Sequence, residues 1–204
     1  MSLVNTVMKE LGSGGLSQIA GSLGMTQKDA KGAVGTAVAV LTGALAHNAS
    51  KPEGAEALDA ALARDHDGSI FDNLGGFLGN IAGGDGGAIL GHVLGGAQPQ
   101  VQQTIAKKSG LSMDKVIPLL ITVAPLVMGA LGKMKKKKKL DAPDLATTLA
   151  KEQRAAVKKD KNDLLGSVLD LLGGSSSSTS SASSGGLLGG LLGAVGGLLG
   201  KKKK

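Results

Sequence analysis

The sequence predicts an all-α, multihelical protein made of an internally duplicated bundle with two similar halves of about 86 residues. Apolar residues recur at helical spacing, and glycine, proline and hydroxyl residues stand where helices would begin or end. Blocks of the first half recur at a shift of 86 positions, so that Leu3 matches Ile89 and Gly24 matches Gly110. The matched positions are apolar residues, glycines and caps, which indicates duplicated architecture rather than duplicated chemistry.

This duplication sets the predicted domain boundaries. We expect a first helical repeat over residues 1–80 and a second over residues 88–173, separated by a glycine-rich stretch. A low-complexity linker of serine and glycine at residues 174–186 is expected to be disordered. A Leu/Gly amphipathic tail with a lysine terminus follows at residues 187–204.

In the first half, residues 3–11 and 16–23 are predicted helices, and the glycines between them end the first one. Thr26, with Asp29 three positions later, resembles a capping box. It opens a long Ala/Val/Gly helix over residues 27–47.

A loop with Pro52 then leads to a shorter helix over residues 55–63. Residues 65–69 are typical of a turn, and Ser69 is expected to cap a helix over residues 70–78. The pattern restarts after the glycine-rich stretch.

In the second half, residues 116–131 are almost wholly apolar and contain Pro118 and Pro125. Proline in a helix interior removes a hydrogen bond and kinks the axis. An apolar helix of this kind is buried in a protein core or in lipid. We favour a core helix, because the segment is shorter than the ~20 residues that span a bilayer; the flanking lysines keep membrane insertion as the alternative. Further helical segments are predicted at residues 141–150, 151–161 and 162–172.

The composition limits the chemistry and the location. The chain has 34 Gly, two Phe, and no Trp, Tyr or Cys. Small side chains favour closely packed thin helices, and without cysteine there are no disulfides or thiolate metal sites. Residues 1–11 lack the basic start and long apolar run of a signal peptide. We therefore expect a cytoplasmic protein, with peripheral membrane attachment as a possible addition.

The net charge of +7 is concentrated in two lysine tracts, with six lysines in residues 133–139 and four in residues 201–204, and the remainder of the chain without these ten lysines carries −3. Attraction to a polyanion, either nucleic acid or an anionic membrane, would act at these tracts. The predicted polyanion-binding residues are Lys135, Lys136, Lys137, Lys138, Lys139, Lys201, Lys202, Lys203 and Lys204.

The tail carries a leucine stripe that spans an arc of about 140° on a helical wheel, opposite an arc of glycine. Glycine costs ~1 kcal/mol relative to alanine in a helix, so we predict a conditional helix that orders on a membrane surface or a partner helix. An inert low-complexity tail is the alternative. The predicted contact residues are Leu187, Leu188, Leu191, Leu192, Val195, Leu198 and Leu199.

No motif for catalysis, a cofactor or a metal stands out. The acidic turn at residues 65–69 lacks the glycine and glutamate positions of an EF-hand, and is interpreted as a turn with a helix cap. Neither the three histidines nor the glycines of residues 83–87 have the spacing of a zinc site or a phosphate loop. We therefore expect a non-catalytic protein without catalytic, cofactor-binding or metal-binding residues.

The sharpest functional pattern is a pair of helix–turn–helix-like units, at residues 16–30 and 101–116. In DNA-binding versions, the start of the second helix contacts base edges. The first unit offers Gln27, Lys28 and Lys31 there, whereas the second runs into apolar sequence and has a poorer contact face. The same geometry is also a common way to pack short helices.

Residues 87–96, which read GAILGHVLGG, with the Gly110 turn and the apolar helix to Leu131, resemble the YidB-like family of uncharacterised bacterial helical proteins. Residues 65–71 fit the same resemblance, which covers most of residues 3–132. It implies an all-α multihelical fold and a bacterial source, but no activity, substrate or catalytic residue. The lysine run and the serine tract are not expected of the family.

We favour a non-catalytic interaction or self-assembly module whose tail binds a membrane or a partner. The expected partners are a second copy, another protein, or an anionic membrane surface. The alternative is a nucleic-acid-binding protein that uses the helix–turn–helix-like units and the lysine tracts, with an affinity that falls as salt rises. An enzyme is the third class.

Overall fold

The computed structural model describes residues 2–80 and 83–173, and all regular structure within these two ranges is helical. The predicted all-α class is therefore confirmed for this part of the chain. The predicted linker and tail, residues 174–204, lie outside it.

The chain begins with α1 (Leu3–Ser22) and α2 (Gln27–Asn48). A kink at Gly12, where φ is 58°, divides α1 in two, so the predicted helix break is a single residue wide. The predicted cap at Thr26 is confirmed, because its hydroxyl accepts from the Asp29 N–H at 3.1 Å and donates to the Asp29 carboxylate at 2.7 Å. This cap fixes where α2 starts.

Three elements complete the first half: α3 (Pro52–Arg64), η1 (Ser69–Phe71) and α4 (Leu74–Gly79). The prediction of one helix over residues 70–78 capped by Ser69 is wrong. The Asp67 carboxylate accepts the Ser69 N–H, and Asn73 caps α4 instead by accepting from the Gly76 N–H. Side chains of this type compete with a continuous helix for backbone donors.

The second half contains α5 (Gly86–Leu94), η3 (Gly95–Ala97), α6 (Gln98–Ser109), α7 (Met113–Lys138), α8 (Ala142–Lys159) and α9 (Leu164–Leu172). The helix α8 is one element where two were predicted. The starts of α2 and α7 lie 86 residues apart, and each follows a glycine with positive φ, 57° at Gly24 and 72° at Gly110. The duplication itself stays a prediction.

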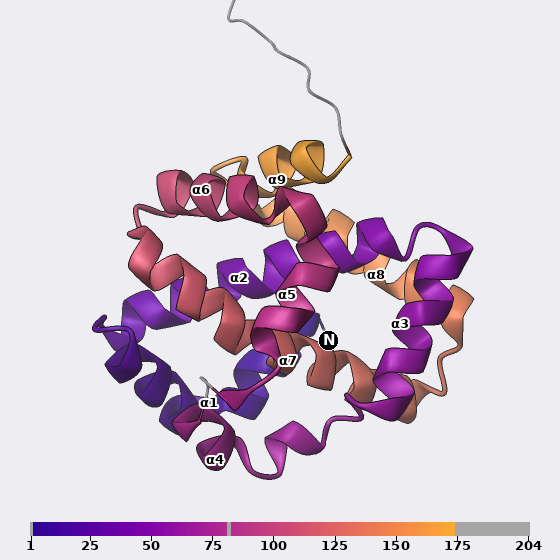
Figure 1. Ribbon diagram of the computed structural model, residues 1–204, viewed down its shortest axis with the longest axis horizontal. Helices are drawn as coiled ribbons and strands as arrows, with labels where there is room; N and C mark the ends of the chain where they lie inside the picture. Colours follow the sequence, from indigo (N-terminus) through magenta and orange to yellow (C-terminus); the bar gives the residue numbers. More distant parts are fainter. Residues whose placement is uncertain (1, 81–82, 174–204) are drawn as a thin grey trace, which may run out of the picture.

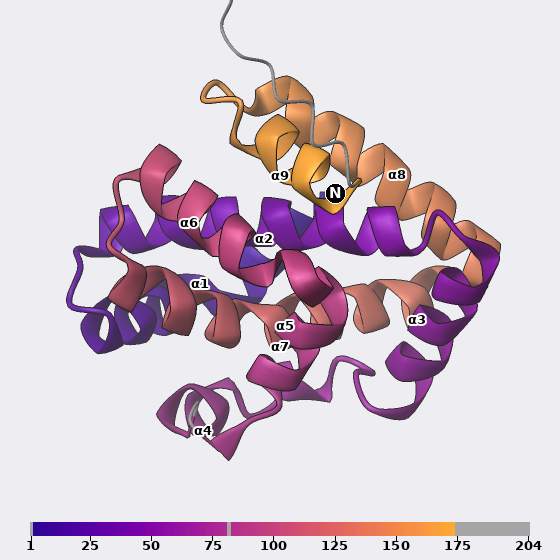
Figure 2. The same ribbon diagram turned by 45° about the horizontal axis from the view of Figure 1, so that its top comes forward.

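The two predicted halves share one hydrophobic core, built around α2 and α7. Figure 2 shows α2 lying between α8 and α9 on one side and α1 and α7 on the other. The helix α3 and the turn η1 of the first half pack on α7, and α8 and α9 of the second half pack on α2 (Figure 1). Each half thus covers the central helix of the other. The largest fully buried side chains include Leu41, Leu62, Leu90, Leu120, Leu126 and Leu149.

The prolines of α7 are accommodated within one continuous helix. Pro125 has no N–H to donate to the Ile121 carbonyl. The helix α5 packs against that carbonyl through Gly86, where any Cβ would clash with the oxygen. By length and composition α7 could cross a membrane, yet 78% of its most apolar 18-residue stretch is buried inside the protein. This burial agrees with the expected core helix.

Candidate functional site

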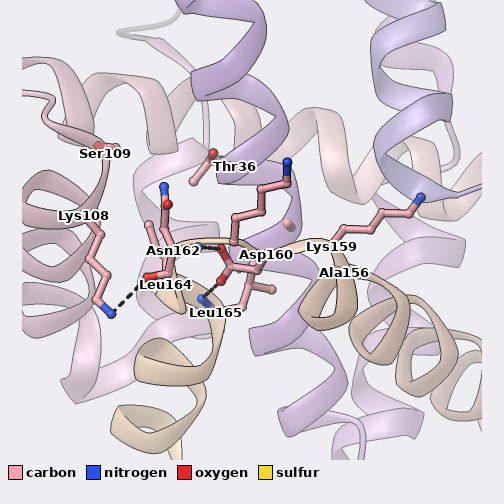
Figure 3. A pocket seen from close by; sticks show the side chains of 11 residues that line it. Thr36, Lys108, Ser109, Ala156, Lys159, Asp160, Asn162, Leu164 and Leu165 are labelled. Atoms are coloured by element: carbon pink, nitrogen blue, oxygen red, sulfur yellow. Dashed lines mark hydrogen bonds between the residues drawn. The ribbon is translucent and has the colours of Figure 1, made fainter.

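A groove runs between the two helix–turn–helix-like units and continues to the loop between α8 and α9; we call it the lysine groove. Two adjoining cavities of about 970 and 320 Å³ form it, and both are lined by Thr36, Lys108, Ser109 and Asn162. Figure 3 shows the smaller cavity. The charged lining residues of the two cavities are Lys28, Asp29, Lys108, Lys115, Lys159, Asp160 and Lys161.

At one end of the groove, the turns of the two units meet. The Lys115 ammonium, at the start of α7, donates to the Gly24 carbonyl at 2.9 Å. The start of α7 is therefore occupied by an internal contact. At the start of α2, by contrast, Lys28 and Lys31 are exposed. Gln27 is also exposed, and its side-chain amide donates to the Ser13 carbonyl at 3.0 Å.

At the other end, hydrogen bonds fix the loop between α8 and α9. The Lys108 ammonium donates to the carbonyls of Asn162 at 3.2 Å and Asp163 at 3.0 Å. The Asp160 carboxylate accepts from the N–H of Asn162 at 3.1 Å and of Leu165 at 2.6 Å (Figure 3). Lys108 and Asp160 thus hold the wall of the groove as well as lining it.

The groove is positively charged, with five lysines against two aspartates among its lining residues. Lys28, Lys159 and Lys161 are exposed, and each lacks a carboxylate partner within the described ranges. These three ammonium groups are available to an anionic ligand. Because several lysines line one concave surface, their positive fields add along it.

Small residues form the α1 and α2 side of the groove. Gly21 and Gly32 line it with no neighbouring atom near the position of a Cβ, and Ala20 and Ala33 lie beside them. No aromatic residue is among the lining residues of either described cavity. A helix or an extended chain could therefore approach the backbone of α2 closely, whereas a base would find no ring to stack on.

The lysine tract at the end of α7 is partly committed to internal ion pairs. Lys133 lies 2.9 Å from a Glu10 carboxylate oxygen, and Lys135 lies 2.8 Å from one of Asp59. Residues 137–139 are exposed, which leaves them as the accessible part of the predicted polyanion-binding tract. The other predicted site residues, at 187–199 and 201–204, lie outside the described residues.

Lys136 holds the acidic turn of residues 65–69 against α7. Its ammonium donates to the Asp67 carboxylate at 2.6 Å. This hydrogen bond, with a second from the Ser69 N–H, lowers the pKa of Asp67 well below its usual range. The acidic turn thus contacts the protein's own lysine. Within the described ranges, no three His, Cys, Asp or Glu residues are grouped so that they could hold a metal ion.

Sequence analysis identified Lys28 but missed Lys108, Lys159 and Lys161. Each stands at or just beyond the C-terminal end of α6 or α8, where a cation is favoured by the helix dipole whatever its function. The sequence therefore offered only a lysine at a helix end, which does not by itself indicate a binding site. Only the packing of α6, α8 and α9 on and around α2 brings these lysines together.

Comparison with known proteins places most of the chain in a family. A family model described as a bacterial protein of unknown function (DUF937) matches residues 5–134. No curated protein and no solved structure matches the chain. The matched range runs from α1 into the last turns of α7, so it includes both turns of the groove but not the wall formed by α8 and α9.

Proposed function

We propose that this chain, which belongs to the DUF937 family of bacterial proteins of unknown function, is a non-catalytic interaction protein whose lysine groove binds an acidic helical segment of a protein partner. The membership agrees with the resemblance to the YidB-like bacterial family. The observation that carries the proposal is that five lysines from both halves line one concave surface, three of them without a carboxylate partner among the described residues.

The shape and charge of the groove favour a helix with carboxylates along its edges. The glycines and alanines of α1 and α2 leave room for such a helix to lie close to the backbone. Lys28 lies on the α2 side of the groove, and Lys159 and Lys161 lie at its α8 end, where their flexible side chains could reach the carboxylates of a bound helix. Complementary charge of this kind speeds association and fixes the register of the partner.

The partner segment could come from a second copy of this chain. Glu53 and Glu56 of α3 are exposed and stand three positions apart on one helix face, which gives each copy an acidic edge of its own. Under this form of the proposal the protein self-assembles, as sequence analysis expected. The leucine stripe of residues 187–199 would add a second contact, with a membrane surface or another helix.

The test uses a fluorescent helical peptide rich in Glu and Ala, and a twin with Gln in place of Glu, titrated into the full chain. The groove variant carries Lys28→Gln, Lys159→Gln and Lys161→Gln. The matched control carries Lys137→Gln, Lys138→Gln and Lys139→Gln, which removes the same charge from an exposed surface elsewhere. Fluorescence anisotropy at low and high salt reports the affinity of each peptide.

We expect the groove variant to bind the Glu peptide at least about tenfold more weakly than the parent, because each lost charge pair contributes to the affinity. The control variant should bind the Glu peptide nearly as well as the parent does. The Gln peptide should bind none of the three proteins. Equal losses in both triple variants would mean that the peptide responds to net charge alone, and the groove would not be its site. Sedimentation of the chain with Glu53→Gln and Glu56→Gln tests self-assembly.

Nucleic acid is the second candidate, because Gln27, Lys28 and Lys31 are exposed at the start of α2. Against it, Asp29 shares that helical turn, and Lys115 of the other unit is engaged with Gly24. Duplex DNA titrated in the same assay separates the two functions. Lys31→Gln, outside the groove lining, should weaken DNA binding and its salt dependence if DNA is the ligand, and should leave peptide binding unchanged if it is not.

A further inference from the structure

A cavity separate from the lysine groove lies at the other end of α2, enclosed by α2, α3, α5 and α7. Its volume of about 540 Å³ falls within the range of small-molecule sites. Leu45, Leu58, Ala61, Ile89, Val93 and Met128 provide apolar walls. Polar groups from the end of α3, the following turn and α5 also line it, namely Arg64, Asp65, His66, Asp85 and His92.

These polar groups leave one acidic position open. Arg64 and Asp65 pair with each other at 2.7 Å and so neutralise one another. The Asp85 carboxylate, whose side chain is 59% exposed, faces Nε2 of His66, whose side chain is only 13% exposed. The two atoms lie 3.9 Å apart, which is too far for a direct hydrogen bond. With a neutral imidazole, the lining therefore carries an excess of negative charge at Asp85.

Close backbone packing fixes the positions of His66 and Asp85. The His66 carbonyl rests directly on Gly132 of α7, where a side chain would clash with it. Asp85 precedes Gly86, whose backbone lies against the Ile121 carbonyl of the same helix. The backbone that carries both side chains is thus packed against α7, which sets the distance between them.

We infer that this cavity binds an amphipathic primary amine, with its ammonium group between Asp85 and His66 and its hydrocarbon body against the apolar walls. An ammonium has three N–H donors, and both facing groups are acceptors when His66 carries its proton on Nδ1. The gap of 3.9 Å between Nε2 and Oδ2 allows one nitrogen to reach both atoms at hydrogen-bond distance. A carboxylate ligand would instead meet the charge of Asp85.

The test compares octylamine, octanol and octanoate, which share one hydrocarbon chain and differ in the head group. Each is titrated into the full chain at about pH 8, where an ordinary imidazole is neutral. Calorimetry gives the affinity, and the NMR signals of the His66 and His92 rings give the location. The variants are Asp85→Asn, the exposed control Asp72→Asn, and Ala57→Leu, which adds volume at an exposed position of the cavity wall.

We expect octylamine to bind at least about tenfold more tightly than octanol, because a charged hydrogen bond is stronger than a neutral one. Asp85→Asn should abolish that preference, Asp72→Asn should keep it, and Ala57→Leu should weaken all three ligands. Equal affinity for amine and alcohol, a preference for octanoate, a preference that survives Asp85→Asn, or no saturable binding would each overturn the inference. None of these outcomes bears on peptide binding in the lysine groove.

Discussion

The helices α2 and α7 begin alike but serve different purposes. Each follows a glycine with positive φ and a hydroxyl residue, at starting positions 86 residues apart. The exposed first turns of α2 line the lysine groove, whereas α7 is tied at its start through Lys115 and buried through its middle. Both helices are buried through their middles, and the difference lies in their first turns, which line the groove in α2 and are tied to the other unit in α7.

The side chains of the two helices account for this difference. The helix α2 is made largely of Ala, Val and Gly, which leave space for a ligand above its exposed face. The helix α7 carries Leu, Met and Pro, which fill the centre of the molecule, and it ends in lysines that pair with Glu10, Asp59 and Asp67.

The largest difference in stability between paired variants should come from two buried positions 86 residues apart, Leu126 of α7 and Val40 of α2. Leu126→Ala should lower the free energy of unfolding by about 2–5 kcal/mol through lost burial and a cavity. Val40→Ala removes less hydrocarbon, at ~0.8 kcal/mol per methylene, and should cost less. Urea unfolding followed by circular dichroism measures both. A larger loss for Val40→Ala would place the centre of the core on α2.

Glycine substitutions should differ in sign between the two helices. Gly132→Ala in α7 puts a Cβ onto the His66 carbonyl and should destabilise by about 1–3 kcal/mol. Gly35→Ala in α2 meets no atom within 4 Å and should stabilise by about 0.5–1 kcal/mol, the usual gain of alanine over glycine in a helix. Thermal unfolding compares them. A Gly35→Ala variant that melts below the parent would contradict the open face of α2.

The caps of the two helices should respond unequally. Thr26→Ala removes the hydrogen bond to the Asp29 N–H and should cost about 0.5–2 kcal/mol. Ser112 makes no side-chain capping bond to a backbone N–H of α7, so Ser112→Ala should cost less. Urea unfolding of both variants measures the two losses, as shifts in the midpoint when the dependence of the free energy on urea is unchanged. Equal losses would show that both caps act in solution.

The smallest effect concerns the ion pair between Lys136 and Asp67, and it depends on pH. The Lys136 ammonium lowers the pKa of Asp67 in the folded state, so the unfolded chain binds that proton more readily. The stabilisation is therefore complete above the ordinary aspartate pKa of about 3.9 and is lost as pH falls through the folded value. Asp67→Asn should lower the urea midpoint at pH 7, with a gap to the parent that narrows in acid. A difference in urea midpoint that does not change with pH would show that the ion pair between Lys136 and Asp67 is not its cause.

Local sequence signals predicted much of the fold. The cap at Thr26 predicts where α2 starts, and the apolar run of residues 116–131 predicts that α7 is buried. Neither prediction needs information from tertiary structure. The prediction failed at residues 70–78, where Asn73 and the neighbouring glycines support a short helix after a turn. At Pro125 the helix α7 continues without ending, and distant Gly86 packs against the carbonyl that the proline leaves without a donor.

The candidate site was less predictable than the fold. Lys28 stood out because it opens a helix, but Lys159 and Lys161 join it only through the packing of α8 and α9 on α2. In the same way, Lys136 looked like part of a free basic tract, and its partner Asp67 is 69 residues away. Contacts over such separations leave no periodic trace in a sequence.

A chemical-shift map of the full chain, recorded while the Glu-rich helical peptide is added, tests the central claim most directly. If the lysine groove binds acidic helices, the largest shifts will cluster at Gly24, Gly32, Thr36 and Gly110, which line it from both halves. Shifts centred on residues 137–139, or spread evenly over all lysines, would contradict the claim.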